Sequence, residues 1–384
     1  MKNFLIRNAI ILNQNFEFHR GDLKISDGFI AEDFKNENEI EIIEAENFYV
    51  VPGLVDIHFH GCAGRDFCDI SENPDEVFKT ILDYENSVGV TTICPATMTL
   101  PEEKLISIMK AARNLKNLAG IYLEGPFISK NKVGAQNPAY VAEPDINILK
   151  RFQNASGNLI KIAAIAPEVG GQNAFDFIEE AKKITRLTLA HTTCDYETAT
   201  RAFKNGVSQV THVFNAMPGI NHRAPGPIIA ALENPDVSVE IICDGVHVHE
   251  AIARNTVKIF GSDRVIFISD SMEATGMKDG EYELGGQKVI KRGNLATLED
   301  CKTIAGSVTN LFDCVRVAVK KMNIPLEIAI KCASLNPARA IGLEKSVGSI
   351  EIGKTANLLL LDKNLNLARV FLIRNSECVM RNYF

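Results

Sequence analysis

The stretch Asp56-Ile57-His58-Phe59-His60-Gly61 continues an apolar run, residues 51–57, that has the composition of a buried strand. Two histidines one residue apart on a strand point to the same face of a sheet. Taken alone, that spacing is more often a structural pair than a metal site. It gains weight from the rest of the chain, because similar apolar runs recur and several others also end in a side chain that can bind a metal.

Apolar runs rich in β-branched residues alternate with amphipathic segments through the middle of the chain. The runs lie near residues 51–57, 90–94, 119–123, 160–166, 187–190, 207–211, 237–243 and 264–269. Helices are expected at residues 74–88, 173–184 and 199–205, the last closed by Gly206, and Asn336-Pro337 is expected to open a late helix. Eight strands alternating with helices predict an α/β fold with a parallel sheet, and eight is the number that closes a (β/α)8 TIM barrel.

Both ends of the chain have strand-like patterns. Residues 4–12 and 22–30 read as short strands, with Asp27-Gly28 as a hairpin turn, and the segment after residue 348 has a similar composition. We therefore expect a small β-sandwich domain made of residues 1–50 and 346–384, beside a metal-dependent barrel of residues 51–345.

Composition limits the kind of protein and its surroundings. A net charge of −7 argues against a broad nucleic-acid surface. No apolar run approaches the roughly 18 residues of a membrane span, and Arg7 and Asn8 interrupt the short apolar N-terminus. The nine cysteines are odd in number and scattered, which fits free thiols in a reducing compartment. We expect a cytoplasmic protein with neither a membrane nor a nucleic acid as partner.

Four more ligand-type side chains follow the histidine pair, each at or just past the end of an apolar run: Glu124, His191, His212 and Asp270. Barrel active sites lie at the carboxyl ends of the strands, and clustered histidines and carboxylates are what a divalent metal needs. The alternatives are a turn carboxylate paired with a basic residue for Glu124 and a loop-capping aspartate for Asp270. The order of the residues favours a site for zinc, iron, manganese or cobalt.

The order of these motifs resembles the amidohydrolase superfamily over nearly the whole chain. Within it, four signatures resemble the N-acetylglucosamine-6-phosphate deacetylase family. They are Leu123-Glu124-Gly125-Pro126-Phe127, Thr211-His212-Val213-Phe214-Asn215-Ala216-Met217-Pro218, Cys243-Asp244-Gly245-Val246-His247 and Ser269-Asp270-Ser271.

The resemblance implies a ligand set for one or two metal ions. Glu124, His191 and His212 would hold the principal metal, and His58 and His60 would hold a second, bridged by Glu124. Many binuclear relatives use a carboxylated lysine after the fourth strand instead, but residues 163–168 contain no lysine.

The resemblance also implies an activity, the hydrolysis of N-acetylglucosamine 6-phosphate to glucosamine 6-phosphate and acetate in amino-sugar catabolism. A bound metal lowers the pKa of its water toward roughly 7. Asp270 would take the proton from this nucleophilic water as general base and later deliver it to the amine as general acid.

Substrate contacts are implied for Ala135, Gln136, Asn215, Ala216, Arg223, His247, Ile304, Ala305 and Gly306. Arg223 would grip the phosphate from the neighbouring subunit of a homodimer, with a solvated loop residue as the alternative. Gln136 stands where family members often have a histidine, and glutamine can donate a hydrogen bond but cannot become cationic.

Two other functions stay open. One is a deacetylase for N-acetylgalactosamine 6-phosphate or another acylated amine, because an inverted hydroxyl leaves no readable trace in the sequence. The other is a catalytically silent sugar-phosphate-binding protein, whose signature would be loss of a metal ligand or of the terminal acid.

Overall fold

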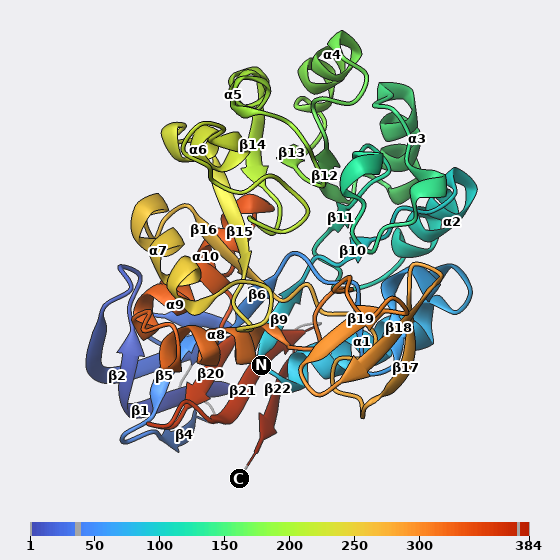
Figure 1. Ribbon diagram of the computed structural model, residues 1–384. Helices are drawn as coiled ribbons and strands as arrows, with labels where there is room; N and C mark the ends of the chain where they lie inside the picture. The colour runs from blue at the N-terminus through green and yellow to red at the C-terminus, as the bar shows by residue number, and fades with distance from the viewer. Residues whose placement is uncertain (1, 35–39, 375–376, 384) are drawn as a thin grey trace.

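The computed structural model describes residues 2–34, 40–374 and 377–383. Its centre is a ring of strands with helices around it, and a separate sheet lies beside the ring (Figure 1). The strands of the ring are β6 (Leu54–Asp56), β9 (Val90–Ile93) and its continuation β10 (Ala96–Thr97), β11 (Ile121–Leu123), β12 (Ile160–Ile165), β13 (Arg186–Leu189), β14 (Val207–Val210), β15 (Ser238–Ile242) and β16 (Val265–Ile268).

These strands form the predicted parallel barrel. β6 pairs with β9, and β10 to β16 pair in chain order, every ladder being parallel. The last strand returns to the first where the backbone N–H of Asp270 donates to the carbonyl oxygen of His58 at 2.9 Å. Aliphatic side chains such as Val55, Ile162 and Ile266 fill the interior. A filled interior leaves the carboxyl ends of the strands as the place for a site.

Helices cover the outside of the barrel. They are α1 (Pro74–Ser87), α2 (Glu102–Ala112), α3 (Ile146–Ser156), α4 (Gln172–Ala181), α5 (Tyr196–Asn205), α6 (Gly226–Glu233), α7 (Glu250–Phe260), α8 (Leu311–Lys320), α9 (Leu326–Ala333) and α10 (Leu335–Ala340). The predicted helices at 74–88, 173–184 and 199–205 correspond to α1, α4 and α5. Gly206 follows α5 with a φ of +124°, a conformation that favours glycine and ends the helix.

The predicted start of the late helix is wrong by two residues. The sequence predicts Asn336 as its N-cap, but Ser334 occupies that position in α10. The side-chain amide of Asn336 instead donates to the carbonyl oxygens of Ser262 and Val265, both at 2.7 Å. Asn336 can lie inside the helix because its amide finds partners beyond its own turn.

A second sheet is built from both ends of the chain. It contains β1 (Asn3–Leu12), β2 (Phe18–Ser26), β3 (Phe29–Ala31), β4 (Ile40–Glu44), β5 (Tyr49–Pro52), β20 (Leu358–Leu361), β21 (Leu367–Arg374) and β22 (Glu377–Asn382). The hairpin at Asp27-Gly28 is confirmed, with φ angles of +52° and +84°. The sheet has its own apolar core, which includes Phe4, Ile25 and Phe371. The division into domains at residues 50 and 346 remains our proposal.

Two smaller sheets were not foreseen. β7 (Gly61–Cys62) pairs with β8 (Arg65–Asp66), and β17 (Gly280–Leu284), β18 (Gln287–Arg292) and β19 (Leu295–Leu298) form an antiparallel sheet after the last barrel strand. The eight cysteines whose side chains the structure describes are free thiols, and only Cys301 among them is exposed. None of the described helices has the length and apolar character needed to cross a bilayer.

Glu85 on α1 is a buried carboxyl group. Among the described residues, its carboxylate oxygens have no hydrogen-bond partner beyond a weak contact with the Cys62 thiol. Burial, together with the neighbouring charge of Asp56, raises the pKa of Glu85 to about 8. The fold therefore favours the protonated form, whereas the unfolded chain ionises near the ordinary glutamate value of about 4.3. Stability from this group is present at low pH and is lost as the pH rises toward 8.

Glu85→Gln should consequently stabilise the protein at high pH. The amide is neutral at every pH, so the difference in unfolding free energy between variant and wild type should widen from pH 5 to pH 8. The widening is limited to about 1.4 kcal/mol per pH unit. Urea unfolding at four pH values measures it. Asp75→Asn, exposed on the same helix, should show a constant difference, and a constant difference for Glu85→Gln would contradict the assigned shift.

Candidate metal centre and active-site cavity

All the predicted ligand residues lie at the carboxyl end of the barrel: His58 and His60 after β6, Glu124 after β11, His191 after β13, His212 after β14 and Asp270 after β16. The backbone is left-handed at three of them, with φ of +43° at His191, +25° at His212 and +50° at Asp270. Non-glycine residues adopt this conformation at a cost of about 1–3 kcal/mol, and such strain concentrates at functional sites.

The carboxylate of Glu124 lies at the centre of the cluster. Its Oε1 is 3.2 Å from His191 Nε2, 3.0 Å from His212 Nε2 and 3.3 Å from His58 Nε2. Its Oε2 is 3.2 Å from His60 Nε2. All five side chains are buried. A carboxylate whose two oxygens face four imidazoles is suited to bridge two cations.

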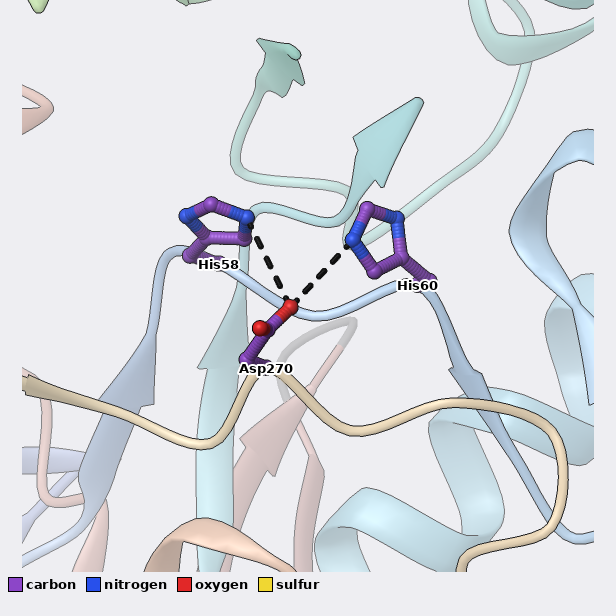
Figure 2. Close-up of side chains that lie close together, drawn as sticks. All are labelled: His58, His60 and Asp270. Carbon is purple, nitrogen blue, oxygen red and sulfur yellow. Dashed lines mark ion pairs between the residues drawn. The ribbon is translucent and has the colours of Figure 1, made fainter. Parts of the chain in front are cut away.

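The potential ligands form two groups, in each of which the ligand atoms lie within 4.8 Å of one another: Glu124, His191 and His212, and His58, His60 and Asp270. Figure 2 shows the second group, in which both imidazoles point toward the Asp270 carboxylate. Asp270 Oδ1 is 3.8 Å from His58 Nε2 and 3.3 Å from His60 Nε2. Imidazole nitrogens and carboxylate oxygens are ligands for divalent transition metals, so both groups fit such an ion.

Electrostatics favour ionised carboxylates in this cluster. Burial opposes the ionisation of Glu124, but the charge of His58 and hydrogen bonds from His191 and His212 hold its pKa well below the ordinary value. Burial also opposes the ionisation of Asp270, but a hydrogen bond from His60 and the histidine charges hold its pKa below the ordinary value. Both groups are therefore anionic at neutral pH, as metal binding and proton acceptance require.

Gln136 contacts Glu124 directly. Its Nε2 donates to Glu124 Oε2 at 2.6 Å, and its Oε1 accepts from the backbone N–H of Thr99 at 2.6 Å. The Thr99 contact fixes which end of the amide faces Glu124. Gly125 keeps Thr99 close, because a Cβ at this glycine would lie 2.0 Å from Thr99 Oγ1. Gln136, expected to contact the substrate, thus holds the central carboxylate in this structure.

A cavity of about 290 Å³ opens above the cluster. Its walls include seven of the predicted substrate contacts, namely Ala135, Gln136, Asn215, Ala216, His247, Ile304 and Gly306. Ala305 is buried and is not part of the wall. Arg223 is not part of it either, and lies in the exposed segment 219–224 between β14 and α6.

His247 brings a paired imidazole to the cavity. Its Nδ1 is 2.7 Å from Asp244 Oδ2, and Asp244 Oδ1 accepts from the backbone N–H groups of Val246 and His247. Burial lowers the pKa of His247, but the hydrogen bond and charge of Asp244 outweigh it and raise the pKa above the ordinary value. Asp244 accepts at Nδ1, and the raised pKa favours the protonated ring, whose other nitrogen then donates to an oxygen-rich ligand.

Several residues of the site were missed by sequence reasoning. Met98 and Leu284 form apolar parts of the wall, and Gly134 also lines it. Glu240 accepts a hydrogen bond from His58. The sequence carries a signal for Glu240, which is the single charged residue in the apolar run 237–243.

Comparisons with known proteins agree with this geometry. The chain matches the amidohydrolase family over residues 49–381. It is 33% identical to N-acetylglucosamine-6-phosphate deacetylase of Bacillus subtilis (strain 168), with 94% of each chain covered. It is 31% identical to N-acetylgalactosamine-6-phosphate deacetylase of Escherichia coli O157:H7, covering 91% of this chain and 93% of the relative.

Among solved structures, it is similar to an aspartate-to-alanine variant of N-acetyl-D-glucosamine-6-phosphate deacetylase from Mycobacterium smegmatis, in complex with N-acetyl-D-glucosamine 6-phosphate. The TM-score is 0.88, the identity is 30%, and 98% of each chain is covered. The chain therefore belongs to the amidohydrolase family. Within that family it groups with the N-acetylglucosamine-6-phosphate deacetylases.

Proposed function

We propose that the protein hydrolyses the N-acetyl group of N-acetylglucosamine 6-phosphate, releasing glucosamine 6-phosphate and acetate, in amino-sugar catabolism. The observation that carries this proposal is the complete set of metal-ligand residues in one buried cluster, of which Glu124, His60, His191, His212 and Asp270 line one cavity. Family membership and the similarity to deacetylases support the same reaction. A catalytically silent binder is disfavoured because no ligand-type residue and no acid is missing.

Two groups of residues would hold the metal ions that amide hydrolysis requires. Glu124, His191 and His212 would hold the principal divalent ion, and His58, His60 and Asp270 face a second position across Glu124. When bound, the metal supplies Lewis-acid activation of water and of the acetyl carbonyl. Zinc, iron, manganese and cobalt all suit these ligands.

Asp270 moves the proton in this scheme. Its depressed pKa keeps it ionised, so that it takes a proton from the attacking water. The same carboxyl group then donates that proton to the departing amine nitrogen. His247 and Asn215, on the cavity wall, supply polar contacts to the sugar, and the backbone N–H of Ala216 supplies one to the phosphate.

The N-acetylgalactosamine 6-phosphate epimer is the second candidate substrate, favoured by the 31% identical relative from E. coli O157:H7. Acetate release from both epimers by metal-loaded protein, with metal analysis of the same sample, decides between them. We expect the larger kcat/KM for the glucosamine epimer. A larger value for the galactosamine epimer would select the alternative, and no acetate from either would leave another acylated amine as substrate, or the binding protein.

We further propose a cytoplasmic homodimer in which Arg223 reaches the phosphate in the neighbouring subunit. Arg223 is exposed and does not line the cavity of its own chain. A guanidinium can grip a phosphate with two parallel hydrogen bonds. A contribution from a partner subunit would reconcile a phosphate-binding role with this position.

Arg223→Ala should raise KM for the phosphorylated sugar by roughly 10- to 100-fold, because a charge-assisted hydrogen bond contributes about 1.5–3 kcal/mol. KM for the unphosphorylated sugar should change little. Steady-state kinetics with both sugars measure the difference. Equal losses for the two sugars would show that Arg223 does not recognise the phosphate.

Mixed dimers test whether Arg223 of one subunit serves the active site of the other. Subunits carrying Arg223→Ala, combined with subunits carrying Asp270→Asn, should regain activity, because one site per mixed dimer then has both groups intact. No recovery in verified mixed dimers would refute a contribution across the interface.

A further inference from the structure

Glu240 is a buried carboxylate behind the metal centre. It lies on β15 with no solvent exposure. Its Oε2 lies 2.9 Å from His58 Nδ1 and accepts a longer bond, 3.3 Å, from the backbone N–H of His212. Its Oε1 accepts from the side-chain amide of Gln209. The carboxylate therefore contacts a side chain of one ligand group and the backbone of the other.

The orientation of the Gln209 amide is itself fixed by Arg186. Its Oε1 accepts from Arg186 Nε at 2.8 Å, so its NH2 group must face Glu240. Arg186 is held in turn by the carbonyl oxygen of Ser208 and the hydroxyl of Ser238, both at 2.9 Å. With Gln209 Nε2 on Oε1 and two donors on Oε2, Glu240 has a hydrogen-bond partner at each oxygen.

Glu240 determines which nitrogen of His58 is available. A carboxylate only accepts, so Nδ1 carries a proton. Nε2, which faces Glu124 and Asp270, is then the nitrogen that can give up its proton and offer a lone pair to a cation. No other imidazole of the cluster has this kind of partner. His191 Nδ1 contacts the neutral carbonyl oxygen of Lys132, and among the described residues His60 Nδ1 and His212 Nδ1 have none.

We propose that Glu240 is the positioning residue of the second metal position: it orients His58 and makes Nε2 a stronger donor, so that the protein binds two divalent ions. Carboxylates behind ligand histidines commonly fix the tautomer and raise ligand basicity, and their loss costs 10- to 100-fold in metal affinity. The inference rests on the proposed metal-dependent function. Glu240 does not line the cavity, and its only side-chain contact with a ligand residue is with His58, its contact with His212 being the longer one to the backbone.

Metal titration tests the inference without any sugar. Metal-free protein is titrated with Co2+ in the presence of a competing chelator, and absorption spectra report the first and second equivalents. In Glu240→Gln the second dissociation constant should rise about 10- to 100-fold, while the first changes less than about threefold. The selective loss is expected because Glu124, His191 and His212 keep their side chains and their mutual contacts.

A double variant separates charge from shape. Glu240→Gln combined with Gln209→Glu exchanges the carboxylate and the amide. The carboxylate introduced at position 209 can accept from Arg186 and from the amide introduced at position 240, whose oxygen still accepts from His58. Every hydrogen bond is thus conserved, and only the negative charge moves away from the imidazole. We expect thermal stability to recover in this variant while the second Co2+ site stays weak.

Recovery of the second Co2+ site in the double variant would overturn the proposal, because hydrogen bonding alone would then suffice. Equal weakening of both sites in Glu240→Gln would also overturn it, as would a wild-type protein that binds only one Co2+. The proposed function fails separately, because it requires acetate release. A wild type that binds two Co2+ ions but hydrolyses neither sugar phosphate refutes the deacetylase and leaves the role of Glu240 intact.

Discussion

Replacing Asp270 by asparagine should lower kcat by about 10²–10⁴-fold, the usual contribution of a general acid–base group. Asparagine keeps the size of the side chain and can hydrogen-bond, but it cannot accept a proton from water and return it to nitrogen. The principal ligand group, Glu124, His191 and His212, does not include Asp270. We therefore expect one metal equivalent to remain bound and KM to change little.

The position of Asp270 calls for a control on metal content. Its Oδ1 lies 3.3 Å from His60 Nε2, within the second ligand group. A loss of rate could therefore come from a lost ion. Assays with excess Co2+ separate the two causes: a proton-transfer defect persists when the second position is saturated. Near-wild-type turnover under those conditions would assign the acid–base role to another group.

A second signature of the proton shuttle is the pH profile. The wild-type kcat/KM should decline at low pH, as Asp270 becomes protonated and can no longer act as a base. Burial raises the pKa of Asp270, but the hydrogen bond with His60 and the neighbouring positive charge lower it overall. A divalent ion bound to these histidines would favour the carboxylate in the same way, so the decline should lie below the range of an ordinary aspartate. The residual kcat/KM of Asp270→Asn should show no such decline at low pH.

The ligand residues could be predicted from the sequence because the barrel topology by itself brings them together. Parallel barrel strands bring their carboxyl ends to one rim, so any side chain just after a strand lies near the others. His58, Glu124 and His212 are far apart in the chain, yet each follows an apolar run. The fold prediction rested on the same alternation and is confirmed by the ladder order β10 to β16.

The supporting contacts could not be predicted, because they depend on distances across the barrel. Nothing in the local sequence links Gln136 with Thr99, or Glu240 with His58, 182 residues away. The antiparallel sheet β17 to β19 had a signal in Gly285-Gly286 and Gly293, which all adopt positive φ in its turns. Eight strands already complete a barrel, so the alternating pattern gives no reason to expect a further sheet. Leu284 reaches the cavity only through this insertion.

Replacing His191 by alanine should remove the principal metal and almost all turnover. His191 Nε2 lies 3.2 Å from both Glu124 Oε1 and His212 Nε2, and its Nδ1 faces the carbonyl oxygen of Lys132 at 2.8 Å. The ring is therefore oriented with Nε2 toward the other two ligands. Two protein ligands are fewer than the three that catalytic zinc sites keep. Metal analysis after dialysis should show at least one equivalent fewer than wild type.

The matched control is Thr193→Ala, two residues further along. Thr193 contacts the Glu168 carboxylate at the rim, through its hydroxyl at 3.0 Å and its backbone N–H at 2.6 Å. It touches no residue of the metal cluster in either contact, so its loss should disturb the loop without removing a ligand. We expect near-wild-type metal content for Thr193→Ala and metal loss for His191→Ala. Full occupancy and turnover in folded His191→Ala would exclude this histidine from the ligand set.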